Sequence, residues 1–589
     1  MRILLLTHAF NSLTQRLFVE LRAQGHELSI EFDVNDRVTE EAVALFRPQL
    51  VIAPFLKRAI PEPVWKNHRC IVIHPGIPGD RGPSALDWAI LRGETSWGVT
   101  ALQANGEMDA GDIWASVPFA MRAASKSSLY RNEVTEAAVA AMRETLTRMA
   151  DPRFRPRPLD YADPAVRGRV LPPVRQSDRT IDWQHDDTGT VLRKIRSADG
   201  FPGVVDTIGD TVFHLYDAHP EGRLRGGAPG ALIAQRHGAV CRATRDGAVW
   251  ITHLKRAGDA RAFKLPATVV LGSDARSLRE DGLAPHAKVA HDTWRDIEYI
   301  EIGDVGLLSF RFYNGAMSTD QCIRLRRAYR HARARPTRVI ALLGGEDFWS
   351  NGIHLNRIEA AEHPAEESWR NINAMDDLVR DIVQTPRQIT IAALRGNAGA
   401  GGVFLALAAD RVLARNGIVL NPHYKGMGNL YGSEYWTYLL PRRVGVDGAR
   451  SVVDNRLPIG AAEAASIGLV DAAIEVAPEA WPGYIGDYAA TLAGDANLAM
   501  LLAEKHRRRA RDEAAKPLQA YRAEELERMR LNFFGFDASY HVARYNFVHK
   551  VPRSRTPLHL AAHRKPDRSP IAGYGDGAQA GGMAATHML

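Results

Sequence analysis

Cysteine is scarce in this sequence of 589 residues, which has only Cys70, Cys241 and Cys322, far apart from one another. Neither zinc ligands nor a disulfide framework has this spacing, so we predict no metal site and a reducing, cytoplasmic location. Long apolar runs are missing too. No stretch approaches the ~18 consecutive apolar residues of a membrane span. The apolar start, RILLL, has no signal-peptide cleavage pattern, so we expect no membrane partner.

A large excess of one charge is also absent. Lys and Arg number 75 against 68 Asp and Glu, a net charge of +7 for the whole chain. The densest basic run, EKHRRRARDE at residues 504–513, is interrupted by acids. This pattern is typical of the solvated face of a helix, with phosphate contact as the alternative. Nucleic acid is not an expected partner.

Strand and helix patterns divide the chain into three structured regions, in line with roughly 100–200 residues per domain. Residues 1–180 alternate short apolar runs with helical periods, which predicts a Rossmann-like α/β domain. Residues 181–285 hold short strands with Gly and Asp turns, typical of a small, OB-like β-barrel. Residues 286–550 predict a second α/β domain, and residues 551–589 are expected to be a disordered tail, ending in a Gly- and Ala-rich stretch.

A histidine and an aspartate follow neighbouring strands of the first region. His74 ends the run CIVIH, and a tight loop, PGIPGDRGP, comes next. Asp109 and Asp112 lie in GEMDAGDIW. At the carboxyl edge of an open α/β sheet, such a pair can move a proton while the carboxylate orients the imidazole. Taken singly, each residue is more often structural than catalytic.

The segments HPGIPGDRGPSA and DAGDIW together resemble the N10-formyltetrahydrofolate-dependent formyltransferases, and the likeness extends over residues 1–285. It implies N10-formyltetrahydrofolate as formyl donor, His74 as acid or base on the accepting nucleophile, and Asp109 as its orienting partner. It also implies that the loop of Arg81 and Gly82 backs the folate pocket. That family has an Asn two residues before the His, where this chain has Val72. Since one such donor is worth ~10²–10³ in rate, we expect either another group to polarise the formyl oxygen or an altered geometry at this site.

Two glycine-containing loops of the third region, FWSNGIHL and RGNAGAGG, are followed later by AAEAASIGLVDAAI. Together they resemble the crotonase, or enoyl-CoA hydratase/isomerase, superfamily over residues 290–550. That resemblance implies a coenzyme A thioester whose oxygen is held by the backbone N–H groups of Ile353 and Gly401. The two hydratase glutamates are absent, because Phe404 stands at the first position and His423 lies near the second. Hydration is therefore not expected.

The segment NPHYKGMGNLYGSEYW at residues 421–436 gathers polar aromatic residues where crotonases have their pocket. It contains His423, Tyr424, Tyr431, Glu434 and Tyr435. Its glycines favour a loop, although a packed aromatic core is the open alternative. We select Tyr431 and Glu434 as a proton shuttle.

The two halves together suggest formyl-CoA, a formyl product held as a thioester. This compound has no α-carbon, so loss of carbon monoxide is the reaction left to an oxyanion hole with one proton shuttle. The whole chain resembles the HypX/HoxX family of hydrogenase maturation factors. The resemblance implies synthesis of carbon monoxide for the iron of [NiFe]-hydrogenase, with the proteins that assemble that iron as partners. Two alternatives stay open: a non-catalytic folate- and CoA-binding scaffold, and an amine formyltransferase with a crotonase-like oligomerisation module.

Coenzyme A would have to reach both sites, and its phosphates need cations or a helix N-terminus. Ordinary helix caps and solvated cations are the alternative interpretation of each candidate. The candidates lie at the first helix, at a later helix start and near the expected adenine end: Asn11, Ser12, Gln15, Arg131, Asn314 and Ala316.

Overall fold

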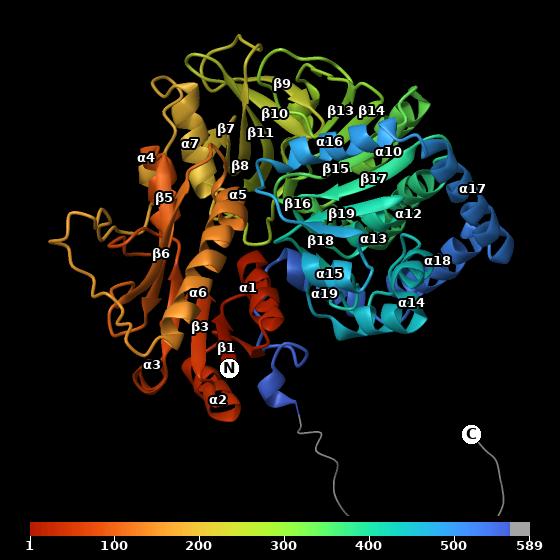
Figure 1. Cartoon of the computed structure of the whole chain (residues 1–589). Coiled ribbons are helices and arrows are strands. Elements are labelled where there is room, and N and C mark those ends of the chain that lie inside the picture. Colours follow the sequence, from red (N-terminus) through yellow and green to blue (C-terminus); the bar gives the residue numbers. More distant parts are fainter. Residues whose placement is uncertain (566–589) are drawn as a thin grey trace, which may run out of the picture.

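The first 150 residues form one sheet with helices on both faces in the computed structural model, which describes residues 1–565 (Figure 1). The elements are β1 (Arg2–Thr7), α1 (Ser12–Ala23), β2 (Glu27–Phe32), α2 (Asp36–Phe46), β3 (Leu50–Phe55), α3 (Glu62–Asn67), β4 (Cys70–His74), α4 (Ala85–Arg92), β5 (Ser96–Gln103), β6 (Ile113–Ala120), α5 (Lys126–Leu129), a π-helical turn (Tyr130–Val134) and α6 (Thr135–Ala150). The strand order is β2-β1-β3-β4-β5-β6, parallel up to β4 and antiparallel beyond it. The predicted Rossmann-like class is confirmed.

The second region is an antiparallel sheet packed against a helix. Its elements are α7 (Thr188–Ala198), β7 (Val204–Ile208), β8 (Thr211–Glu221), β9 (Leu232–Arg236), β10 (Ala239–Ala243), β11 (Ala248–Arg256), β12 (Leu265–Pro266), α8 (Ala267–Leu271) and α9 (Ser273–Arg276). The order is β7-β8-β11-β10-β9, with β12 paired to β11. No pairing between β7 and β9 closes this sheet among the described strands. A small β domain is therefore present, and its OB-like closure stays a prediction.

The third region has two sheets and most of the helices. The elements are β13 (Ile297–Ile302), β14 (Val305–Phe310), α10 (Thr319–Ala334), β15 (Val339–Leu343), β16 (Phe348–Ser350), α11 (Leu355–Glu359), α12 (Pro364–Val383), β17 (Ile389–Leu394), β18 (Asn397–Gly399), α13 (Gly401–Leu407), β19 (Arg411–Arg415), β20 (Val419–Asn421), α14 (Trp436–Asn455), β21 (Ile459–Gly460), α15 (Ala461–Ser466), β22 (Ala472–Ile474), α16 (Trp481–Gly494), α17 (Leu498–Ala515), α18 (Leu518–Phe534) and α19 (Ser539–Val548). The larger sheet runs β13-β14-β15-β17-β19-β22 and the smaller β16-β18-β20-β21. The boundaries expected at residues 180, 285 and 550 lie between these units and stay predictions.

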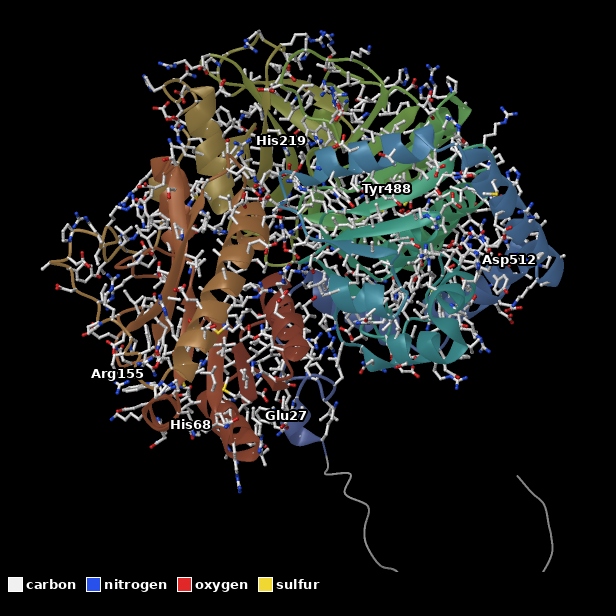
Figure 2. All side chains as sticks on the ribbon, viewed as in Figure 1. Glu27, His68, Arg155, His219, Tyr488 and Asp512 are labelled. Atoms are coloured by element: carbon white, nitrogen blue, oxygen red, sulfur yellow. The ribbon has the colours of Figure 1, made fainter. Side chains whose placement is uncertain are left out.

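The first and third regions contact each other, because α1 packs against β20 and β21. Figure 1 shows α1 between the first sheet and the later half, and Figure 2 places Arg155 and Asp512 at opposite ends of the molecule. Val419 and Leu560 belong to the same buried apolar cluster as the first sheet. The halves thus share a core. None of the helices within residues 1–565 is both long and apolar enough to cross a membrane.

The segment that follows α19 corrects one prediction. Residues 551–565, expected to be disordered, lie along the edge strand β2. The Ile30 N–H donates to Leu560 O at 3.1 Å, and the Phe32 N–H donates to Thr556 Oγ1 at 2.8 Å. His563 Nε2 lies 2.9 Å from a Glu31 carboxylate oxygen. Hydrogen bonds to β2 and buried side-chain contacts therefore outweigh the polar composition here, and the rest of the predicted tail, 566–589, lies outside the described residues.

Candidate active sites

His74 is buried at the end of β4 with a carboxylate at each ring nitrogen. Nε2 lies 2.9 Å from Asp80 Oδ2, and Nδ1 lies 3.5 Å from Asp109 Oδ2. Burial disfavours the charged ring, but the hydrogen bond with Asp80 and the charges of Asp109 and Asp80 outweigh it and raise the pKa of His74. An imidazole held this way is oriented, and its charged form is stabilised, as acid–base transfer requires. The predicted pairing of His74 with Asp109 is thus present in the structure.

Asp80 is not among the residues predicted from the sequence, although it is the closer carboxylate. It reaches the ring because the loop folds back tightly at Gly76. A Cβ placed on Gly76 would lie 2.3 Å from His74 Nε2 and 2.6 Å from Asp80 Oδ2, so only glycine fits. An acidic residue six positions after the histidine, in a loop with several glycines, was the available signal.

The remaining predicted residues of this site differ in their roles. Gly82 donates its N–H to Asp109 Oδ2 at 3.3 Å, so it supports the carboxylate beside the histidine. Arg81 is held by the neighbouring loop, with Nε donating to Met108 O at 2.9 Å. Val72 lies on the same face of β4 as His74 and packs into an apolar cluster, so position 72 supplies no hydrogen-bond donor to a formyl oxygen.

The two predicted oxyanion-hole residues lie on adjacent loops of the third region. A Cβ on Gly352 would lie 3.2 Å from Gly401 N, which shows how closely the loops approach. Trp349 Nε1 donates to Gly402 O at 2.8 Å and fixes one loop to the other. Among residues 1–565, the N–H groups of Ile353 and Gly401 donate to no backbone acceptor. Two free amides at one place can hold a developing oxyanion.

Glu434 lies directly against Gly401, one of these two residues. A Cβ on Gly401 would lie only 2.1 Å from Glu434 Oε1. The other carboxylate oxygen, Oε2, accepts a hydrogen bond from the Tyr424 hydroxyl at 2.5 Å. Burial and the charge of Asp376 raise the pKa of Glu434 to about 8. A carboxyl group that titrates near neutral pH, bonded to a phenol, is suited to passing protons in both directions.

Phe404 occupies the position of the first hydratase glutamate. Its ring stacks on the Tyr424 ring with 5.4 Å between centroids and an interplanar angle of 18°. The turn at Gly432 also packs against that tyrosine: φ of Gly432 is +93°, and a Cβ there would lie 2.1 Å from Tyr424 Cε2. Phe404 and the turn at Gly432 therefore hold the Tyr424 ring in place, and its hydroxyl is hydrogen-bonded to Glu434.

Tyr431 does not join this pair, which corrects the predicted shuttle. Its side chain is exposed, its ring packs against Trp436 at 5.5 Å, and its N–H donates to Asn532 Oδ1 at 3.0 Å. Tyr424 lies beside Glu434 instead, in the position that was expected for Tyr431. The loop winds through several glycines between the two tyrosines, so their separation in sequence did not indicate which one faces Glu434.

The predicted coenzyme A residues lie along the seam between the two halves. Arg131 donates to Asn314 Oδ1 at 3.0 Å and lies over the Phe348 ring at 4.8 Å. Gln15 Oε1 accepts from Asn421 Nδ2 at 2.9 Å, so a second contact crosses the same seam. These contacts bring three of the predicted residues to the boundary between the first and third regions.

The other three candidates are less distinctive. Asn11 caps α1 by accepting the Thr14 N–H at 3.0 Å, as in the alternative interpretation. Ser12 is the first residue of that helix, and Ala316 ends a short turn by donating its N–H to Tyr313 O at 3.4 Å. Their positions beside the seam keep them as candidates, without a contact of their own that points to a ligand.

Gly401→Ala should lower activity at the second site sharply, because the new methyl group would overlap the Glu434 carboxyl. Displacing a reacting group by about 1 Å costs on the order of 100-fold in rate. For the carbon monoxide release that the family resemblance implies for this site, measured with haemoglobin, we expect that loss, with little change at the His74 site. Gly483→Ala is the control, because nothing lies within 4 Å of a Cβ at that position. Normal gas release by Gly401→Ala would show that Glu434 lies elsewhere in the working enzyme.

A His–carboxylate pair on a Rossmann-like sheet, joined to a second α/β domain with two adjacent glycine loops, matches what is expected of a formyltransferase fused to an enoyl-CoA hydratase-like domain. Family models agree: formyl transferase matches residues 24–146, formyl transferase C-terminal domain 173–263, and enoyl-CoA hydratase/isomerase 313–530. The chain is 58% identical to hydrogenase maturation factor HoxX of Bradyrhizobium diazoefficiens, over 96% of this chain and 97% of that protein. It therefore belongs to the HypX/HoxX family of hydrogenase maturation factors.

Two further comparisons extend this result. The crystal structure of HypX from Aquifex aeolicus in complex with tetrahydrofolic acid superposes with a TM-score of 0.93 at 48% identity, covering 97% of this chain and 100% of that one. A methionyl-tRNA formyltransferase of Nitrosomonas eutropha is 25% identical over 215 residues, 36% of this chain and 66% of that protein. The formyltransferase likeness is thus confined to part of the chain, whereas the HypX likeness runs through nearly all of it.

Proposed function

We propose that this protein makes carbon monoxide for the iron of a [NiFe]-hydrogenase in two steps. The first transfers a formyl group from N10-formyltetrahydrofolate to the thiol of coenzyme A, and the second splits formyl-CoA into carbon monoxide and coenzyme A. The observation that carries the proposal is the Tyr424–Glu434 pair against the free amide of Gly401, where a hydratase would have its glutamates. Proteins that assemble the hydrogenase iron would be its partners.

In the first step the residues around His74 move one proton. His74 takes the proton of the attacking thiol, and Asp109 and Asp80 stabilise the resulting imidazolium. The ring then returns this proton to the departing nitrogen of the folate. The tetrahydrofolic acid named for the HypX structure supports folate as the donor. Val72 stands where the formyltransferase family has an asparagine. The hydrogen-bond donor to the formyl oxygen therefore has to come from another element or from the substrate.

In the second step a proton moves from the formyl carbon to sulfur. Ionised Glu434 accepts the formyl proton, while the N–H groups of Ile353 and Gly401 stabilise negative charge on the carbonyl oxygen. As the carbon–sulfur bond breaks and carbon monoxide leaves, the Tyr424 hydroxyl donates its proton to the sulfur. Glu434 then passes the formyl proton to Tyr424 across their 2.5 Å hydrogen bond, which restores both groups.

The seam between the halves fits coenzyme A by the chemistry of its residues. Arg131 is a half-buried cation next to amide groups, and Asn314 and Gln15 offer side-chain carbonyl and N–H groups. Such groups would hold phosphates and the pantetheine amides. Asp347 partly balances the charge of Arg131 at 3.3 Å, so this cation alone is not a strong phosphate site. Whether coenzyme A exchanges or stays bound decides if it acts as substrate or carrier.

Two other functions compete with this proposal: a non-catalytic scaffold that binds folate and coenzyme A, and an amine formyltransferase. The buried pairs around His74 and Glu434 speak against a scaffold, because isolated charges are costly to bury without a purpose. A tRNA-binding formyltransferase would carry a markedly basic surface, and the net charge here is only +7.

The test is gas release by the purified protein supplied with N10-formyltetrahydrofolate, with and without added coenzyme A. We expect the spectrum of deoxyhaemoglobin to shift to that of its carbon monoxide complex. Dependence on added coenzyme A would show that it is exchanged. An untouched donor and no gas would favour the scaffold, whereas a consumed donor without gas would indicate a formyltransferase with another acceptor.

A further inference from the structure

Behind the turn that carries Glu434, two more buried carboxyl groups come from distant parts of the chain. Asp376 lies on α12 and Glu525 on α18, and the side chains of all three acids are almost completely buried. None of the reaction steps above uses Asp376 or Glu525. Buried carboxyl groups are rare unless they are paired or have a role, so this acidic cluster of Asp376, Glu434 and Glu525 needs an explanation.

The two extra carboxyl groups hold the backbone of the turn. Asp376 Oδ1 accepts the N–H of Glu434 at 2.8 Å, and Glu525 Oε2 accepts the N–H of Tyr435 at 2.9 Å. The Ser433 hydroxyl lies 2.9 Å from each oxygen of Asp376. Glu434 and Tyr435 have φ values of +59° and +58°, a left-handed conformation that non-glycine residues adopt only when the surroundings impose it. These bonds fix where the Glu434 side chain leaves the backbone.

Cationic charge within the cluster is too small for three ionised carboxylates. Arg522 Nε lies 3.6 Å from Asp376 Oδ2, but the same guanidinium also donates to Asp377 at 2.7 Å. Burial raises the pKa of Asp376 to about 6, with Arg522 opposing this, whereas burial and the charge of Asp376 raise the pKa of Glu434 and of Glu525 to about 8. Asp376 therefore carries the negative charge near neutral pH.

The titratable and charged groups around the acidic cluster come from several elements. Tyr424 comes from the same loop as Glu434, Asp376 from α12, and Glu525 and Arg522 from α18. The Cys322 thiol of α10 also lies near Glu434, and burial raises its pKa. The oxygens of the cluster face N–H and O–H donors, and within residues 1–565 no three His, Cys, Asp or Glu side chains have the arrangement of a metal site.

We propose that Asp376 and Glu525 are positioning residues for Glu434: they fix its turn, and the negative charge on Asp376 makes Glu434 a stronger base and a proton holder near neutral pH. The inference rests on the proposed decarbonylation, because it explains how a carboxylate becomes basic enough to take a formyl proton. The proton accepted by Glu434 in that step is the one that reaches sulfur through Tyr424, so no further reactant is needed.

The first test measures the Glu434 proton without using activity. The carboxylic C=O stretch of the full-length protein is followed by infrared difference spectroscopy across pH, and the band lost in Glu434→Gln identifies Glu434. We expect it to titrate near pH 8. Asp376→Asn should lower that midpoint by roughly one to two units, the size of effect that a nearby like charge produces. A wild-type midpoint at the ordinary value, or one unmoved by Asp376→Asn, would overturn the proposal.

The second test is the pH profile of carbon monoxide release, whose rising limb should shift downward by the same amount in Asp376→Asn. Asp381→Asn is the matched control on the same helix, because Asp381 pairs with Arg326 and Arg330 instead. Glu525→Gln, which keeps an acceptor for Tyr435, should shift the profile less and serves if Asp376→Asn fails to fold. If the infrared midpoints behave as expected and no gas is made by any variant, the proposed function fails and the proton assignment stands.

Discussion

Carbon monoxide release should fall by ~10²–10⁴-fold in Glu434→Gln and in Tyr424→Phe, the range that a general acid–base group contributes. Glutamine cannot accept the formyl proton, and phenylalanine removes the hydroxyl that bonds to Glu434 Oε2 at 2.5 Å. Formyl transfer from the folate should continue in both variants, because His74 lies in the other half of the chain. Formyl-CoA should therefore accumulate and be detectable by mass spectrometry.

Tyr431→Phe is the matched control, since it removes the other tyrosine hydroxyl of the same loop. That side chain is exposed and packs on Trp436, so we expect gas release within about twofold of the wild type. A severe loss in Tyr431→Phe together with normal release in Tyr424→Phe would restore the assignment first expected from the sequence. Equal release by both would remove tyrosine from the mechanism.

Loss of the imidazole in His74→Ala should reduce formyl transfer by ~10²–10⁴-fold, again the range for a general acid–base group. Asp109 and Asp80 would remain buried without their partner, so we also expect a lower unfolding temperature than in the wild type. The rate is measured as disappearance of the formyl donor, and thermal unfolding is recorded alongside.

We expect His74→Ala to leave the third region, residues 286–550, functional. Coenzyme A binding, measured by calorimetry, and gas release from chemically prepared formyl-CoA should stay near wild-type levels. His68→Ala is the control for replacing a histidine of the same domain, since His68 is half-buried between α3 and the start of β4, whereas His74 ends that strand. If His74→Ala transferred formyl groups normally, the site around β4 would not be the place of transfer.

The fold was predictable because its signals repeat along the chain. Apolar runs separated by helical periods indicated both α/β units, and the glycine loops placed Ile353 and Gly401 side by side. The ordered segment after α19 did not follow from composition. Residues 551–565 are ordered by contacts with β2, which lies more than 500 positions earlier in the chain. Contacts of that span leave no local pattern.

The candidate site was predictable where its residues lie in short, distinctive motifs and was missed where distant elements meet. His74 and Asp109 were found because their motifs are dense in unusual residues. Tyr424 was passed over for Tyr431 since a glycine-rich loop has no fixed period from which to deduce direction. Asp376 lies 58 positions before Glu434. Its helical pattern is that of an ordinary amphipathic segment, so nothing local marks it as a partner.

The pairing of residues 551–565 with β2 has a consequence for how the protein is made. An edge strand with unpaired N–H and C=O groups is a template for association with other chains. During translation the first sheet can fold long before residue 565 leaves the ribosome, and β2 then stays uncovered for most of the synthesis time. The nascent chain is therefore most prone to aggregation, and most in need of a chaperone, in the interval before its last segment arrives.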